Sequence, residues 1–138
     1  MSEENLSEDV MILSSTSREE ELETILYQIA ETIENDLHCF VYLECDDCCF
    51  IPYPFYDDIV GEINVDGSLT NIKRLIALAH EVGHLLDDSE STNTVQLELN
   101  AWHLGYKYML MESIVIDSEE YFDQMYQCLS EYIKKEEK

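Results

Sequence analysis

Positive charge is scarce in this sequence. The chain carries 7 Lys and Arg residues against 31 Asp and Glu residues, which gives a formal net charge of −24 at pH 7 over 138 residues. Such a field repels nucleic acid and anionic membranes, and it attracts cations and basic proteins. We therefore expect no direct binding to nucleic acid or membrane. The charge either serves solubility, as in a salt-rich habitat, or faces a basic partner such as the DNA-binding surface of another protein.

Long hydrophobic runs and a basic N-terminus are also missing. No stretch approaches the roughly 18 consecutive apolar residues of a membrane-spanning helix. The first residues, MSEENLSEDV, are acidic and lack the basic start of a signal or transit peptide. The 5 cysteines are odd in number, and without a secretory signal they predict reduced thiols rather than a disulfide framework. We expect a cytoplasmic protein.

The length and composition are those of one compact domain. Hydrophobic residues make up 46% of the chain and charged residues 28%, which is a globular composition and not a disordered one. Residues 1–17 are polar and acidic apart from the short patch VMIL, and we expect a flexible arm there. Residues 18–138 are expected to form a single domain.

The hydrophobic pattern predicts an α+β fold with an N-terminal helix, a small three-stranded sheet and three further helices. Apolar residues recur at helical spacing at both ends of the chain, whereas aromatic and β-branched residues dominate between them. Pro52 and Pro54 indicate that the second strand is an edge strand or partly irregular. Ser68 or Thr70 can cap the second helix. The predicted helices are 18–37, 71–88, 95–111 and about 118–138, and the predicted strands are 38–45, 49–56 and 58–67.

The most specific motif is HEVGH, inside the apolar run IALAHEVGHLLDD. His80 and His84 are four residues apart, so one helical turn brings both imidazoles to the same face, where they can bind one zinc ion. Glu81 lies about 100° around the helix, within reach of a metal-bound water. This is the HExxH arrangement, with Glu81 as the catalytic general base.

A catalytic zinc site needs a third protein ligand and one open position. Glu98 and His103 are both candidates in the next helix, in ELNAWHLG. Glu98 shares a helix face with Ala101, Trp102, Gly105 and Met109, which look like inward-facing positions. A carboxylate there is costly without a partner, and zinc supplies one. His103 projects about 140° away. We therefore predict His80, His84 and Glu98 as the Zn²⁺ ligands.

The motif LAHEVGHLL followed by ELNAW resembles the gluzincin branch of the zinc metallopeptidases, and in particular the compact ImmA/IrrE family. The likeness covers roughly residues 20–112. It implies a zincin-like minimal metalloprotease domain in which His80, His84 and Glu98 hold the metal and Glu81 is the base. Members of that family cleave DNA-binding repressors, which implies a protein substrate for this chain. A separate helix-turn-helix or sensor domain, present in several members, has no room here.

Three secondary features have weaker signals. Tyr106 is a candidate donor to the oxyanion of the reaction, and Asp87 or Asp88 a candidate to orient an imidazole. The segment CDDCC holds Cys45, Cys48 and Cys49, but no second ligand pair accompanies them, so we interpret them as ordinary thiols.

Two functional classes remain open. The first is a zinc-dependent metallopeptidase that hydrolyses a peptide bond in a basic protein, such as a DNA-binding regulator. The second is a non-enzymatic acidic protein on a zincin scaffold, which binds and inhibits a basic nucleic-acid-binding protein as a DNA mimic. An intact Glu81 favours the first class, because a purely structural metal site needs no base.

Overall fold

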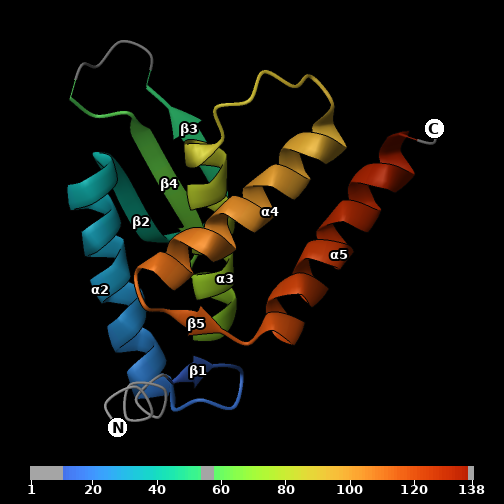
Figure 1. Cartoon of the computed structure of the whole chain (residues 1–138). Helices are drawn as coiled ribbons and strands as arrows, with labels where there is room; N and C mark the ends of the chain where they lie inside the picture. The colour runs from blue at the N-terminus through green and yellow to red at the C-terminus, as the bar shows by residue number, and fades with distance from the viewer. Residues whose placement is uncertain (1–10, 54–57, 137–138) are drawn as a thin grey trace, which may run out of the picture.

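The computed structural model describes residues 11–53 and 58–136. Within these residues the chain forms an α+β fold, as predicted (Figure 1). None of the described helices is both long enough and apolar enough to cross a membrane. The elements in chain order are β1 (Ile12–Leu13), α2 (Glu19–Leu37), β2 (Cys39–Cys45), β3 (Cys49–Pro52), β4 (Gly61–Asp66), α3 (Asn71–Leu86), α4 (Thr94–Met111), β5 (Val115–Ile116) and α5 (Ser118–Glu136).

The predicted three-stranded sheet is confirmed, and its order is β2-β4-β3. Strand β4, the last of these three in sequence, lies in the middle. It pairs in parallel with β2 and antiparallel with β3. The second strand is an edge strand, as its prolines predicted, and its ladder ends at Pro52. The prediction extended this strand to residue 56, but residues 54–57 lie outside the described part of the chain.

One face of the sheet packs against helices. Side chains alternate along β2 and β4, so that Cys39, Leu43, Ile63 and Val65 are buried while their neighbours are exposed or half-buried. Helix α2 contacts β2, and α3 contacts β3 and β4, as the arrangement of these elements in Figure 1 shows. The core therefore lies between this face of the sheet and the helices.

The helix ends follow from local chemistry. Arg18 occupies the N-cap position of α2 without a capping hydrogen bond from its side chain, and the first turn holds Glu19, Glu20 and Glu21, whose charges favour a helix N-terminus. Of the two caps predicted for α3, the structure has Thr70, whose side chain accepts a hydrogen bond from the Lys73 amide. The predicted helix boundaries hold within two residues at the ends that the structure describes.

The expected N-terminal arm, residues 1–17, is corrected in its described part. Ile12–Leu13 form β1, which pairs in parallel with β5. The Asp117 amide donates to the Leu13 carbonyl at 2.7 Å, and Leu13 is buried. Of the apolar patch in the acidic arm, Leu13 is therefore part of the core, whereas Met11 and Ile12 are exposed. Residues 1–10 lie outside the described residues.

Helices α3 and α4 touch at their backbones. A Cβ atom at Gly83 would overlap the Ala101 carbonyl, and one at Gly105 would overlap the Ala79 carbonyl. Two glycine–alanine contacts therefore set the spacing between the helices. The α3 members of these contacts, Ala79 and Gly83, lie on either side of His80 in sequence, where the two helices cross.

Candidate metal centre

The three predicted ligands come together on facing sides of α3 and α4. His80 and His84 lie one turn apart on α3, and Glu98 lies in the second turn of α4. His80 and His84 are half-buried, and Glu98 is buried, with 7% of its surface exposed. Among the described residues, this is the one group of three His, Cys, Asp or Glu side chains whose potential ligand atoms lie within 4.8 Å of one another.

The two imidazole nitrogens of the cluster lie about 3 Å from each other, and each lies about 3 Å from one of the two carboxylate oxygens. His80 Nε2 lies 2.9 Å from Glu98 Oε1, and His84 Nε2 lies 3.1 Å from Glu98 Oε2. The two Nε2 atoms are 3.2 Å apart. Ligands at zinc distances of about 2.0–2.1 Å in a tetrahedron are about 3.3 Å from each other. The observed distances of 2.9–3.2 Å are close to that value, so the spacing of the side chains is compatible with one zinc ion.

The electrostatics of the cluster favour an ionised carboxylate. Burial alone would raise the pKa of Glu98, but hydrogen bonds from His80 and His84 outweigh it and lower that pKa to about 2. Burial lowers the pKa of His84, but the hydrogen bond to Glu98 and the charges of Glu98, Glu81 and Asp87 together outweigh this effect and raise it. Glu98 is thus a carboxylate at neutral pH, as a metal ligand must be.

Glu81 has a different environment, although it lies next to His80 in sequence. Its carboxylate is buried, with Oε2 lying 3.7 Å from His80 Nδ1. Burial raises the pKa of Glu81 more than the nearby histidines lower it. A carboxylate with a raised pKa is a stronger base than a solvated one, and this suits a general base that works near neutral pH.

Trp102 holds the ring of His80 in place. The two rings are stacked, with centroids 4.1 Å apart and planes 11° from parallel. Tyr121 of α5 packs edge-on against Trp102, with the ring centroids 5.3 Å apart. Its hydroxyl donates a hydrogen bond to the Trp102 carbonyl. The sequence placed Trp102 on the inward face of α4, and the structure adds that it serves as a platform for a candidate ligand.

The cluster lies in the wall of a cavity of about 520 Å³. Residues of the loop before β3, of β3 and of α5 complete its lining. These additional residues are Cys48, Cys49, Phe50, Cys128 and Tyr132. The sequence analysis did not find Tyr132 or Cys128, because they reach the site only through the way α5 packs beside α4.

None of the thiols around the cavity belongs to the group of converging ligand atoms found among the described residues. Burial raises the pKa of Cys48 and of Cys128 above the ordinary value, which favours the neutral thiol over the thiolate that binds metals. All five cysteines lie in the described residues, and none forms a disulfide. This agrees with the interpretation of these cysteines as ordinary reduced thiols.

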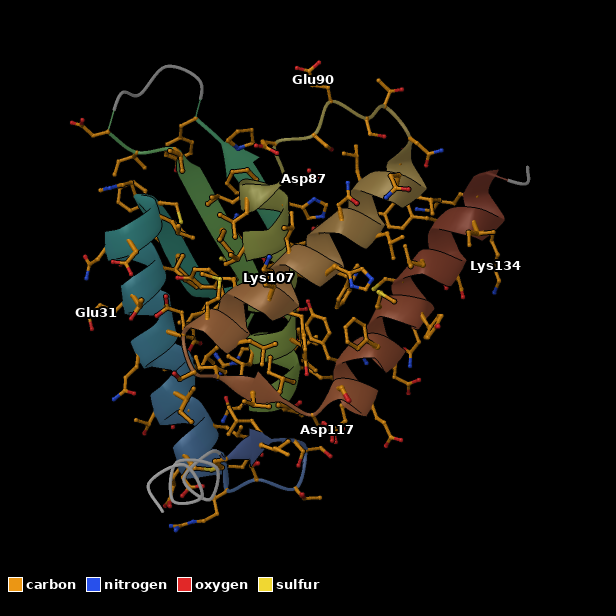
Figure 2. The ribbon with its side chains drawn as sticks, in the orientation of Figure 1. Glu31, Asp87, Glu90, Lys107, Asp117 and Lys134 are labelled. Atoms are coloured by element: carbon orange, nitrogen blue, oxygen red, sulfur yellow. The ribbon has the colours of Figure 1, made fainter. Side chains whose placement is uncertain are left out.

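Four other residues that the sequence singled out do not belong to the group of converging ligand atoms. The hydroxyl of Tyr106 donates to the Ile116 carbonyl at 3.1 Å, so the interpretation of Tyr106 as an oxyanion donor is wrong for this geometry. His103 is exposed, and its ring contacts Phe122 of α5. Asp87 caps the end of α3 and accepts from the Ser89 amide at 2.9 Å, and Asp88 is exposed. Figure 2 shows Asp87 at this end of the helix, close to the start of α4.

Comparison of the chain with protein-family models, with curated proteins and with solved structures gives no match. The resemblance of its motifs to the ImmA/IrrE family therefore stays a prediction. The functional proposal depends on the geometry of the metal centre.

Proposed function

We propose that this chain is a zinc-dependent metallopeptidase of the gluzincin type, with a zincin-like fold. One observation carries the proposal: the ligand atoms of His80, His84 and Glu98 converge, while the buried carboxylate of Glu81 lies beside them in an open cavity. A purely structural zinc site is closed by four protein ligands. Three ligands, a basic carboxylate and an accessible cavity are the parts of a hydrolytic site.

The residues of the chain have separate tasks in this reaction. A bound zinc ion supplies a Lewis acid that makes a coordinated water acidic and polarises the peptide carbonyl. Glu81 accepts a proton from the attacking water and passes it to the leaving amine, for which its raised pKa is suited. Trp102 keeps the ring of His80 in one orientation, so that the ligand geometry is preserved as the substrate binds.

The surroundings of the centre favour an extended peptide of a basic protein as substrate. Strand β3 is at the edge of the sheet and contributes Cys49 and Phe50 to the cavity. An edge strand can pair with an extended peptide through its backbone. The net charge of −24 attracts basic chains. A DNA-binding regulator in the cytoplasm combines these properties, and we propose such proteins as the substrate class.

Metal binding tests the first part of this proposal. We expect the purified chain to bind one zinc ion, measured by elemental analysis after dialysis. His80→Ala removes a ligand and should abolish stoichiometric binding. His103→Ala is the matched control, because it removes an exposed imidazole from α4 and should leave one zinc ion per chain. Equal zinc content in the two variants would contradict the assignment of the ligands.

Hydrolysis tests the second part. Zinc-loaded protein is incubated with a random peptide library and with intact histones as basic proteins, and new termini are identified by mass spectrometry. We expect cleavage that stops when a chelator removes the zinc and returns when zinc is restored. If zinc-loaded protein leaves both substrates intact, the peptidase proposal fails.

Tyr132 is our candidate for the donor that stabilises the oxyanion. It lines the cavity from α5, and burial, followed by the charge of Glu98, raises its pKa, so the phenol stays protonated. Loss of one such donor lowers kcat about 10²-fold. We therefore expect Tyr132→Phe to reduce kcat by about this factor with zinc content unchanged. Tyr126→Phe on the same helix, where the side chain is 66% exposed, should have no effect. An unchanged kcat in Tyr132→Phe would remove this role.

The alternative function is binding without catalysis. The excess of acidic residues favours it, since a surface of this charge can occupy the nucleic-acid site of a basic protein. In that case the metal would stabilise the scaffold and Glu81 would have no task. The two functions differ in their response to substitution of Glu81.

A further inference from the structure

The face of the sheet turned away from α3, which we call the open face, carries exposed side chains among the described residues. Phe40 and Tyr42 of β2, before the register shift of that strand, and Glu62 and Asn64 of β4 point to this side, and the register with β3 adds Ile51 opposite Glu62. Large apolar side chains are among them: Phe40 is 39% exposed, Tyr42 46% and Ile51 42%. We define the open face by five residues, which are Phe40, Tyr42, Ile51, Glu62 and Asn64.

Aromatic rings form a cluster on the open face. The centroid of Phe40 lies 6.2 Å from that of Tyr42 and 6.3 Å from that of Tyr53, which follows β3. The rings are tilted by 36° and 57° relative to Phe40, so they do not stack on one another. Tilted, partly exposed rings can offer their faces to a cation, and the planar guanidinium of arginine suits such faces particularly well.

A fixed carboxylate lies next to these rings. Glu62 is the register partner of Phe40, and it accepts hydrogen bonds from Tyr53 and from the Asn64 side chain. These two hydrogen bonds lower the pKa of Glu62, so its negative charge persists at neutral pH. A carboxylate has room for further donors after two hydrogen bonds. Rings and an ionised carboxylate therefore lie together, which is the combination that binds arginine.

A second carboxylate, that of Glu44, lies at the edge of the open face, where the pairing of β2 with β4 is irregular. Glu44 accepts a hydrogen bond from Tyr27 at 2.9 Å, and its side chain is 72% exposed. It also lies 3.7 Å from Arg74, but that guanidinium is buried and bonded to the Leu43 carbonyl and to Asn71. Because Arg74 is held by these other acceptors, Glu44 stays accessible to a second cation.

We propose that the open face is a docking surface for an arginine-rich segment of a partner protein. The chemistry of the face fits a guanidinium, and the net charge of −24 favours the approach of a cationic segment. The same charge opposes the other occupants: nucleic acid and anionic lipid are repelled, and a second copy of the chain would bring two acidic surfaces together. The docking surface is separate from the metal centre, which lies between α3 and α4 on the helical side of the sheet, and it requires no hydrolysis.

Binding of a synthetic peptide of alternating arginine and serine tests this inference. Its affinity for the full chain is measured by fluorescence anisotropy at about 0.15 M salt, where exposed charges more than about 8 Å apart are largely screened. The test variant combines Tyr42→Ser with Glu62→Gln. The control combines Tyr126→Ser with Glu23→Gln, which removes one tyrosine and one charge from exposed positions on α5 and α2. We expect a loss of about tenfold in the test variant and less than about twofold in the control.

Three results would overturn the inference. Equal losses in the two variants would mean that the peptide responds to total charge alone. Equal affinity of the unaltered chain for the arginine peptide and for a glycine–serine peptide of the same length would mean that the face binds no cationic segment. A dimer in analytical ultracentrifugation that dissociates in the test variant would make the open face a self-association surface instead. Circular dichroism of both variants ensures that the comparison is made between folded proteins.

Discussion

Glu81→Gln is expected to lower the rate of peptide hydrolysis about 10³-fold while the chain still binds one zinc ion. Glutamine has the shape of glutamate and fits the same buried position, where 5% of the residue is exposed. It cannot accept the proton of the attacking water, however, because an amide is not a base at neutral pH. The three metal ligands are unchanged, so the substitution separates hydrolysis from metal binding.

Two matched variants make the Glu81 result interpretable. Glu90→Gln makes the same chemical change in the exposed loop between α3 and α4, where Figure 2 labels Glu90, and should leave the rate and the zinc content unchanged. His80→Ala should lose both. Rates are measured on one zinc-dependent substrate at saturating concentration, with zinc determined on the same samples.

The same variants decide between the two functions. If Glu81→Gln abolishes the effect of the chain on a basic partner, the effect requires hydrolysis. If Glu81→Gln acts on that partner as well as the unaltered chain does, binding is sufficient, and the peptidase proposal is wrong for that partner. In that second case the effect should decrease steeply as salt is added, because it would depend on the charge of the surface.

The convergence of the three candidate ligands could be predicted from the sequence because each had a local or an energetic signal. The spacing of His80 and His84 places both on one helix face whatever the rest of the fold does. Glu98 had no such partner in the sequence, but a carboxylate on an apolar face is costly to bury alone. The structure brings all three within 4.8 Å of one another, as the helix geometry predicted.

The position of Tyr132, our candidate for the oxyanion donor, could not be predicted in the same way. The sequence indicates Tyr106 as a candidate for that role instead. Tyr106 lies eight residues beyond Glu98, which is about 12 Å along the helix, and its hydroxyl binds Ile116 near the far end of α4. Tyr132 reaches the cavity because the chain turns back after α4 and α5 packs beside it. Nothing in the sequence of either helix specifies that return.

The turns at His38 and Ser113 could not be predicted from the sequence, because neither position holds a glycine or an asparagine. The chain has 4 glycines, and the two described non-glycine residues with positive φ are His38, at 57°, and Ser113, at 66°. Left-handed positions such as these are ordinarily occupied by glycine or asparagine. His38 ends α2, and Ser113 lies in the turn from α4 to β5. The pairing of β1 with β5 follows that turn, which is why the short strand at Ile12–Leu13 was missed.

Gly105→Ala is expected to lower the free energy of unfolding by about 3 kcal/mol. Alanine in an open helix position is favoured over glycine by about 1 kcal/mol, so a simple propensity effect has the opposite sign. Here the new Cβ would overlap the carbonyl oxygen of Ala79 and lie 2.6 Å from its carbonyl carbon. Backbone atoms cannot rotate away as a side chain does, so α3 and α4 must move apart.

The same displacement should weaken zinc binding, because the metal site spans the two helices. Glu98 is on α4 and both histidines are on α3, so a shift of a few tenths of an ångström changes two ligand distances at once. Lys107→Ala is the control: it changes an exposed residue of the same helix (Figure 2) and should leave stability and zinc affinity nearly unchanged. Urea denaturation of metal-free protein and zinc titration measure the two effects separately. If Gly105→Ala is as stable as Lys107→Ala, the helices are not held at backbone contact, and the close approach that brings Glu98 to the histidines has another cause.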